Sequence, residues 1–392
     1  MNSNRVHTGL EVLVERRRDL LAGKRVGMIV NPTSVNADLE HAADLMRAPP
    51  DVALTTLFGP QHGIRGETQD NMIEWEGYFD PATGVRVYSL YGQTRIPTPE
   101  MLSNLDVLIF DVQDVGARYY TFIYTMTLAM QACARAGKEF IVLDRPNPIN
   151  GRDVEGPLLE RQFASFVGLY PLPHRHGLTV GEVARYINAE EKMDCRLEVV
   201  PMRGWRRPMW FDQTGLPWVI PSPNMPTLDT AIVYPGMCLI EGTMLSEGRG
   251  TTRPFELVGA PWADAIQMAA RLNRVGLPGV RFRPASFLPT FQKHAGQMCH
   301  GFQLHVTDRD SFKPFLTGIA VIQQFYQFDP RSFRWKDPPY EYEYEKLPID
   351  ILLGSDRLRL QLVEGVDVWE MERGWRDELE EFKERRAQYL LY

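Results

Sequence analysis

Short apolar runs, each followed by a polar loop, recur four times in the first 150 residues and constrain the fold more than any other feature. The runs are residues 26–30, 51–59, 106–111 and 139–144. A run that is apolar on consecutive positions is typical of a strand covered on both faces, as in a parallel sheet. Apolar side chains at helical spacing in residues 37–48 and 119–136 add the helices of βαβ units. The pattern predicts an α/β fold.

The polar loops after these strands predict a binding site. Their sequences are NPTS, GPQHG, DVQDVGAR and DRPNPING. In an open α/β sheet, ligands bind beyond the carboxyl ends of the strands, where such loops meet. Ordinary solvated loops are the alternative, but four successive loops here carry Asn, Asp, Arg or His. The residues in and near these loops that we expect to contact a ligand are Asn31, Arg65, Asp111, Gln113, Asp114, Arg118, Tyr119, Asp144, Arg145 and Asn147.

The length of 392 residues favours two domains. Residues 215–236 are rich in proline, lack a clear period and suggest a rigid crossing between lobes. Beyond them, helices are expected over residues 262–275, 317–328 and 367–391, and an antiparallel strand over residues 301–312. We therefore predict an α/β domain at residues 1–228 and a smaller α+β domain at residues 229–392.

Composition and missing motifs exclude several classes of protein. A net charge of -7 disfavours nucleic acid as a partner. No stretch has the length of a membrane span and the first residues lack a signal-peptide core, so a soluble cytoplasmic protein is expected. The absence of GxGxxG and GxxxxGK[ST] disfavours a nucleotide, and no cofactor is predicted. The four scattered cysteines predict neither a disulfide framework nor a zinc–thiolate site.

Carboxylates are the reactive groups that this sequence offers. His62 with Glu67, Asp70 and Glu74 lacks the spacing of a metal site, so no metal is predicted. Neither a GxSxG turn nor a cysteine in a nucleophile context is present. Glycosidic cleavage needs a carboxylic acid with a raised pKa and a second group that stabilises positive charge at the anomeric carbon. Glu67, in the loop beyond a strand, is the strongest candidate, although single acids more often cap helices or form ion pairs.

Many ordered blocks of the chain resemble one family of enzymes. They include VGMIVNPTSV, LFGPQHGIRGETQDN, DVQDVGARYYTF, LDRPNPINGRDVEGP, SPNMPTLDTAIVYPG and EGTMLSEGRGTTRPFELVGAPW. Together they resemble the NamZ family of exo-β-N-acetylmuramidases, from about Gly9 to the C-terminus. The resemblance implies a Rossmann-like first lobe, a smaller second lobe and an active-site cleft between them. It also implies removal of N-acetylmuramic acid from the non-reducing end of peptidoglycan fragments in cell-wall turnover or recycling, without metal or nucleotide.

One departure from the family pattern affects the catalytic assignment. Many members resemble PEHG where this chain has PQHG, so Gln61 replaces a glutamate. If the family's acid aligns with position 61, this protein is altered or inactive; if it aligns with Glu67, the chemistry is intact. We favour Glu67, with Glu74 and Asp70 as support, and expect His62 and Gln61 in the same catalytic block.

The substrate class adds a requirement for a cation. N-acetylmuramic acid carries a lactyl carboxylate, which a guanidinium pairs in a bidentate fork. Arg65, Arg118, Arg145 and Arg249 lie in suitable loops, and Trp75, Tyr119 and Tyr120 could supply faces for a sugar. His176, Asn224, Glu241 and Glu247 complete the predicted substrate contacts. The expected substrate is a muropeptide or a disaccharide of N-acetylmuramic acid and N-acetylglucosamine, and a homodimer is left open.

Two other functions compete with this one. A two-lobed amino-sugar-binding protein without catalysis would account for Gln61. A hydrolase of another N-acetylhexosaminide would use the same cleft.

Overall fold

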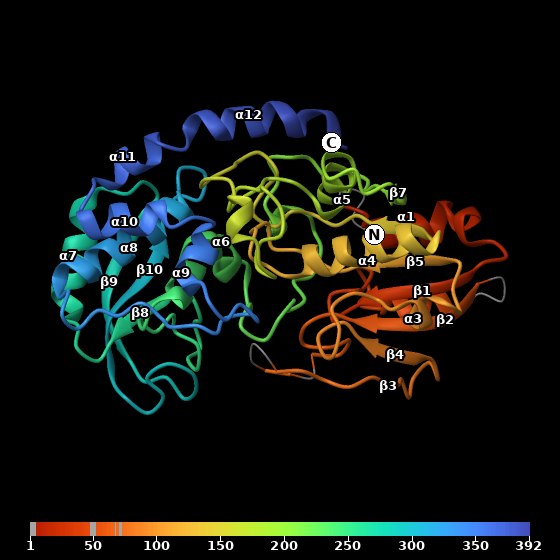
Figure 1. The fold of residues 1–392 in the computed structure, drawn as a ribbon, viewed down its shortest axis with the longest axis horizontal. Coiled ribbons are helices and arrows are strands. Elements are labelled where there is room, and N and C mark those ends of the chain that lie inside the picture. Colours follow the sequence, from red (N-terminus) through yellow and green to blue (C-terminus); the bar gives the residue numbers. More distant parts are fainter. Residues whose placement is uncertain (1–4, 48–51, 67, 70–72) are drawn as a thin grey trace.

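The apolar runs form the central strands of a seven-stranded sheet in the first of two lobes (Figure 1). The computed structural model describes residues 5–47, 52–66, 68–69 and 73–392. The strand order is β3-β4-β2-β1-β5-β6-β7, and all neighbours are parallel except β3 and β4. The predicted parallel sheet is therefore present. The strands are β1 (Arg25–Val30), β2 (Ala53–Gly59), β3 (Tyr78–Phe79), β4 (Arg86–Ser89), β5 (Val107–Asp111), β6 (Glu139–Leu143) and β7 (Arg196–Val200).

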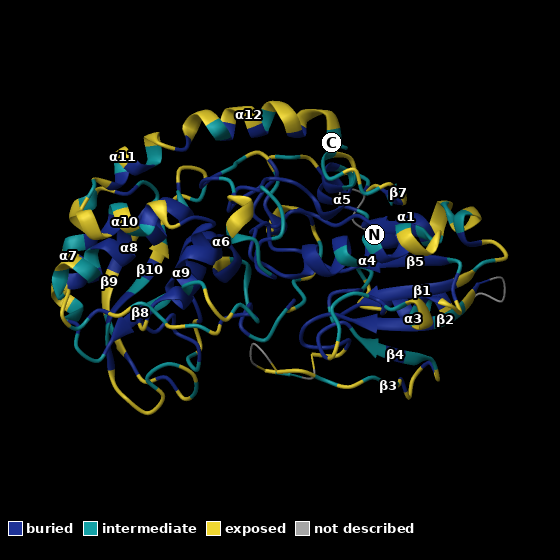
Figure 2. Ribbon diagram, in the orientation of Figure 1, coloured by how far each residue is buried: buried dark blue, intermediate teal, exposed yellow. Residues whose placement is uncertain are grey.

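Helices cover both faces of this sheet, as its apolar strands require. Along β1, Met28 packs with α1 and α2 on one face, whereas the adjacent Ile29 belongs to the core that includes α4 and α5. The central strands are accordingly buried and the β3–β4 edge is more exposed (Figure 2). The helices of this lobe are α1 (Gly9–Arg16), α2 (Ala42–Arg47), α3 (Pro99–Leu102), α4 (Phe122–Ala136) and α5 (Val180–Glu190), with 3-10 turns η1 (Arg18–Leu21), η2 (Arg161–Phe163) and η3 (Phe211–Gln213).

The second lobe combines a three-stranded antiparallel sheet, in the order β8-β10-β9, with helices (Figure 1). Its elements are α6 (Leu228–Met237), η4 (Cys238–Gly242), β8 (Leu257–Ala260), α7 (Ala265–Val275), β9 (Val280–Phe287), β10 (Cys299–Val306), α8 (Pro314–Phe328), α9 (Pro348–Leu353), α10 (Arg357–Glu364), α11 (Val368–Arg373), α12 (Arg376–Arg386) and η5 (Ala387–Tyr389). Within the described ranges, no helix has the length and apolar character needed to cross a bilayer.

Helices α6 and α8 approach each other backbone to backbone. A Cβ atom added at Gly236 would overlap the carbonyl oxygen of Pro314, and one added at Gly318 would overlap that of Gly236. Glycine at both positions therefore sets the closeness of this crossing. The apolar core on this side of the large sheet runs without interruption into the second lobe.

Three expectations about local structure were wrong. Helix α2 begins at Ala42 rather than near residue 37, because Leu39 adopts a positive φ of 65° in a turn that the Asn36 side chain stabilises. The end of the proline-rich segment is helical, since α6 starts at Leu228. The predicted helix over residues 367–391 is two helices, because the chain breaks between α11 and α12 at Trp375, which is buried against Phe315.

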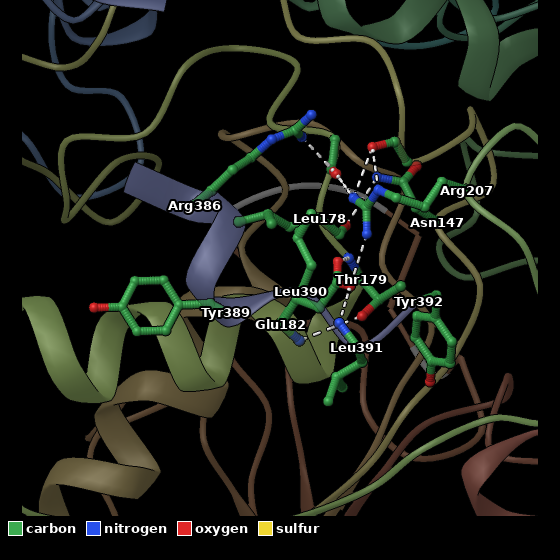
Figure 3. A network of polar contacts seen from close by, with 12 residues as sticks. Asn147, Leu178, Thr179, Glu182, Arg207, Arg386, Tyr389, Leu390, Leu391 and Tyr392 are labelled. Carbon is green, nitrogen blue, oxygen red and sulfur yellow. Dashed lines mark hydrogen bonds and ion pairs between the residues drawn. The ribbon is translucent and has the colours of Figure 1, made fainter. Parts of the chain in front are cut away.

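The C-terminal segment returns from the second lobe to the first. Helix α12 crosses one side of the molecule (Figure 1), and the residues after it lie near Thr179 and Glu182 at the start of α5 (Figure 3). The Tyr392 hydroxyl donates to Asp144 Oδ2 at 2.7 Å and accepts from the backbone N–H of Met202 at 2.7 Å. The Leu391 backbone N–H donates to Glu182 Oε1 at 2.8 Å. These bonds connect the last residues to the carboxyl edge of the large sheet.

We predict that Tyr392→Phe lowers the free energy of unfolding by roughly 1–3 kcal/mol, because Asp144 loses a donor and the Met202 N–H loses its acceptor in a largely buried setting. Urea unfolding followed by circular dichroism measures this change. Tyr389→Phe is the matched control, since the Tyr389 hydroxyl contacts only the half-buried Glu190. Equal losses in both variants would contradict a special role for Tyr392.

Candidate active site

A pocket lies where the two lobes meet, beside the carboxyl end of β2 and the start of α4. It encloses about 500 Å³ of space between its lining atoms, including the part open to solvent. The first lobe contributes the turn after β2, and the second lobe contributes η4 and the loops around residues 249 and 341. The lining residues are Gln61, His62, Tyr119, Tyr120, Thr121, Phe122, Val167, Ser222, Asn224, Met225, Tyr234, Glu241, Arg249, Phe255, Tyr340 and Glu341.

Aromatic rings form one wall of this pocket. Tyr234 meets Tyr119 and Tyr120 edge to face, each with a ring-centroid distance of 5.7 Å, and meets Phe255 at 4.9 Å. Edge-to-face packing holds each ring in a fixed orientation. The wall thus offers rigid apolar surface beside charged groups, a combination suited to a sugar ring.

A chain of buried charges lies beside this wall, where the Arg249 guanidinium is 5.1 Å from the centroid of the Phe255 ring. Arg249 donates to Glu241 at 2.8 Å and lies 3.3 Å from Glu247, which pairs with Lys293 at 2.6 Å. The Tyr340 hydroxyl donates to the second oxygen of Glu241 at 2.5 Å. Burial raises the pKa of the Glu241 carboxyl, but Arg249, the Tyr340 hydrogen bond and Lys293 outweigh it and hold the pKa below its ordinary value. Glu241 is therefore ionised at neutral pH.

A second carboxyl group, Glu341, lies in the same pocket in a different environment. It is 3% exposed, and burial followed by the charge of Glu241 raises its pKa to about 7. Tyr91 donates to Glu341 Oε2 at 2.7 Å, and Gln61 Nε2 donates to the Tyr91 hydroxyl at 3.1 Å. Thr121 Oγ1 in turn donates to Gln61 Oε1 at 2.8 Å. A row of hydrogen bonds therefore runs from the start of α4 through Gln61 to Glu341.

Backbone strain accompanies these side chains. His62, Phe255 and Glu341 adopt positive φ values of 71°, 64° and 46°. Residues other than glycine occupy this region at a cost of order 1 kcal/mol or more, and such residues cluster at functional sites. Three strained residues around one pocket support a functional reading of it.

Only some of the site residues predicted from the sequence line this pocket. Gln61, His62, Tyr119, Asn224, Glu241 and Arg249 line it, and Glu247 adjoins it through Arg249. Glu67 and Asp70 lie outside the described residues. Glu74 is exposed, and Arg65 is exposed and paired with Asp80 at 3.2 Å.

The other predicted residues lie in the protein interior and do not line this pocket. Arg145 forms a bidentate pair with Asp111 at 2.6 and 2.9 Å, and the buried Arg118 donates to backbone carbonyls, that of Leu352 included. Residues that share this pattern of bonds to protein groups are Asn31, Gln113, Asp114, Asp144, Asn147 and His176. A second pocket, with about 350 Å³ of space between its lining atoms, lies at the loops after β1, β5 and β6, and Gln113 and Arg145 line it together with residues 216–219. Contact of these residues with substrate stays a prediction.

Several pocket residues were missed by the sequence analysis. Glu341 and Tyr340 are the main ones, together with Tyr91 behind Glu341 and Lys293 behind Glu247. The alternation of tyrosine and glutamate over residues 340–344 is a signal that could have found Glu341. In the part of the chain that the structure describes, no three His, Cys, Asp or Glu residues are grouped so that they could hold a metal ion.

Two family models match the sequence, one in each lobe. A sequence model described as the N-terminal part of exo-beta-N-acetylmuramidase NamZ matches residues 26–229. The model of the C-terminal part matches residues 232–392. The chain belongs to the NamZ family.

Individual relatives agree with the family match. Peptidoglycan beta-N-acetylmuramidase NamZ of Bacillus subtilis (strain 168) is 48% identical over 388 residues, which are 99% of this chain and 92% of that protein. Crystal structures of two DUF1343 family proteins from Bacteroides fragilis NCTC 9343 resemble this structure with TM-scores of 0.88 and 0.77 at 39% and 28% identity. Each alignment covers 99% of both chains. The α/β fold with two lobes is thus that of the NamZ family.

In this member of the NamZ family, we predict that Arg249→Met lowers the free energy of unfolding by roughly 3–5 kcal/mol, because the buried Glu241 and Glu247 lose a shared cation. Arg253→Met is the control. Arg253 has a side chain that is 44% exposed, and the loss there should stay below about 1 kcal/mol. The urea denaturation midpoints of both variants measure these losses of stability. Equal small losses would show that the charge chain adds little stability.

Proposed function

We propose that the chain is an exo-acting β-N-acetylmuramidase that releases N-acetylmuramic acid from the non-reducing end of peptidoglycan fragments. Membership of the NamZ family and the name of the Bacillus subtilis relative support this activity. The observation that carries it is the pair Glu241 and Glu341, two carboxyl groups in one pocket whose pKa values are shifted in opposite directions. Such a divergence is how glycosidases divide acid and anion roles between two carboxyl groups.

The ionised Glu241 suits the stabilisation of positive charge at the anomeric carbon. Its carboxylate is fixed from two sides, by Arg249 and by the Tyr340 hydroxyl, so it does not need to reorganise as charge develops. The aromatic wall of Tyr119, Tyr120 and Tyr234 packs against the apolar face of the sugar. The fragment bound is a muropeptide or a disaccharide of N-acetylmuramic acid and N-acetylglucosamine.

The identity of the proton donor is a separate question. Sequence reasoning favours Glu67, which lies outside the described residues, and keeps Glu74 as support. Gln61 carries an amide and cannot donate a proton as an acid. The described part of the pocket adds Glu341 as a candidate.

The lactyl carboxylate of the substrate requires a cation near the pocket. Arg65 is our first candidate, on the sequence argument, and its side chain is 41% exposed beyond the end of β2, where it pairs with Asp80. Arg249 is the second, since its guanidinium already lies between Glu241 and Glu247. A cytoplasmic location and a homodimer remain predictions from the sequence.

Gln61 favours one alternative, an amino-sugar-binding protein without turnover. Release of the chromophore from an aryl N-acetylmuramide distinguishes an enzyme from such a protein. A panel of aryl N-acetylglucosaminides tests the third function, hydrolysis of another N-acetylhexosaminide.

We predict that N-acetylmuramides are preferred over N-acetylglucosaminides, which lack the lactyl group. A partly desolvated charge-assisted pair contributes roughly 1.5–3 kcal/mol, or about ten- to a hundred-fold or slightly more in kcat/KM. Arg65→Ala should remove most of this preference by slowing muramide turnover, with the glucosaminide rate nearly unchanged. Measurement of kcat/KM for both sugars in wild type, Arg65→Ala and Arg249→Ala tests whether one of these arginines pairs with the lactyl carboxylate. A wild-type preference for the glucosaminide would overturn the muramidase assignment.

A further inference from the structure

Glu341 lies in a place suited to donate a proton to the leaving group of a glycoside. It lines the same pocket as Glu241, and its neighbour Tyr340 donates to Glu241, so adjacent residues of one loop bring both carboxyl groups to the site. Its Oε2 atom accepts from Tyr91, which leaves Oε1 as the oxygen available to carry a proton. Sequence reasoning did not single out this residue.

The hydrogen bonds behind Glu341 have a fixed direction. Because the Gln61 amide N–H donates to the Tyr91 hydroxyl, the hydrogen of that hydroxyl is directed to Glu341. The Thr121 hydroxyl donates to the amide oxygen of Gln61 and orients that amide. A glutamate at position 61 would have no N–H to donate and would compete for the Tyr91 hydrogen. The amide at position 61 therefore donates to Tyr91 and does not compete for the hydrogen that Tyr91 gives to Glu341.

The loop that carries Glu341 is held rigidly. The Arg95 guanidinium lies 3.5 Å from the centroid of the Tyr342 ring and 5.4 Å from that of Tyr91. Glu341 and Tyr342 both adopt positive φ, at 46° and 68°. The Arg95 guanidinium over the Tyr342 ring stabilises a backbone conformation that brings Glu341 to the pocket.

We propose that Glu341 is the proton donor of the glycosidase reaction, with Tyr91 and Gln61 as its positioning residues; this rests on the function proposed above. The O–H bond of the neutral carboxyl breaks and its proton joins the glycosidic oxygen, while the bond between that oxygen and the anomeric carbon breaks and leaves its electron pair on oxygen. The alcohol departs, and water adds its hydroxyl to the anomeric carbon. The proton released by that water restores Glu341, directly or through solvent.

The charged and titratable groups that face Glu341 are consistent with this role. Burial and the charge of Glu241 favour the neutral carboxyl, whereas the Tyr91 hydrogen bond and the charges of Arg95 and Arg249 favour the carboxylate. The balance leaves a pKa of about 7, so a large share of the enzyme carries the proton at neutral pH. A donor poised in this range can both release and regain its proton.

Leaving-group dependence provides the first test. In Glu341→Gln we expect kcat for the disaccharide, whose sugar leaving group needs a proton, to fall by on the order of 10²–10⁴. For a nitrophenyl N-acetylmuramide, which leaves readily without one, the fall should stay within about tenfold. Glu345→Gln, an exposed residue of the same segment, is the matched control and should hydrolyse both substrates at wild-type rates.

The pH profile provides the second test and a readout that a merely structural role would not move. In wild type, kcat/KM for the disaccharide should fall above pH 7 as Glu341 loses its proton. Tyr91→Phe removes a hydrogen bond that favours the carboxylate, so the pKa of Glu341 rises and this alkaline limb moves to higher pH. A folded Tyr91→Phe enzyme with an unmoved limb would overturn the proposal even if Glu341→Gln fails to fold.

The outcomes separate this proposal from the function on which it rests. If wild type hydrolyses neither substrate, the muramidase assignment fails. If wild type is active and Glu67→Gln shows the leaving-group dependence while Glu341→Gln does not, the muramidase assignment stands and Glu67 is the donor. Dependence in Glu341→Gln, with near-normal disaccharide turnover in Glu67→Gln, supports Glu341.

Discussion

The pairing of buried charges is the constraint on which this structure depends. A charge removed from water is costly unless a partner and hydrogen bonds compensate it, and this protein buries charges at both the sheet edge and the pocket. Arg145, 5% exposed, spans from Asp111 at the end of β5 to the Val35 carbonyl in the loop after β1. The ends of three strands are thereby locked together. The same solution recurs in the second lobe, where Arg249 lies between two glutamates.

These two charged regions have different consequences for chemistry. At the sheet edge, charged side chains pair within the protein, as Arg145 does with Asp111, and this pairing orders the loops. In the pocket, the cations lie closer to Glu241 and Glu247 than to Glu341, and the two carboxyl groups that face the cavity differ in protonation. Because the cations are unevenly distributed, one carboxyl group is ionised and the other can carry a proton, which is the difference that acid catalysis needs.

The sequence predicted the architecture better than the site. Buried strands such as residues 106–111 are recognisable because a doubly covered strand must be apolar throughout, and this holds without knowledge of its neighbours. Polar loops are harder to interpret, since Asp111 and Arg145 have the composition of a binding site but bond to each other. Glu241 and Glu341 are a hundred positions apart, and only the tertiary fold brings them to one pocket. The missed break at Trp375 likewise reflects burial against a distant residue, Phe315.

The glycine crossing of α6 and α8 has a mechanical consequence for the pocket. Tyr234, the ring that meets three others in the aromatic wall, lies on α6 two residues before Gly236. That wall is therefore held by a helix crossing at which the two backbones touch, so the position of Tyr234 is closely fixed. Differences in what the pocket accepts would then arise in the loop around Asn224. The helices fix the position of the aromatic wall against the sugar, and changes of substrate specificity would arise in the loops.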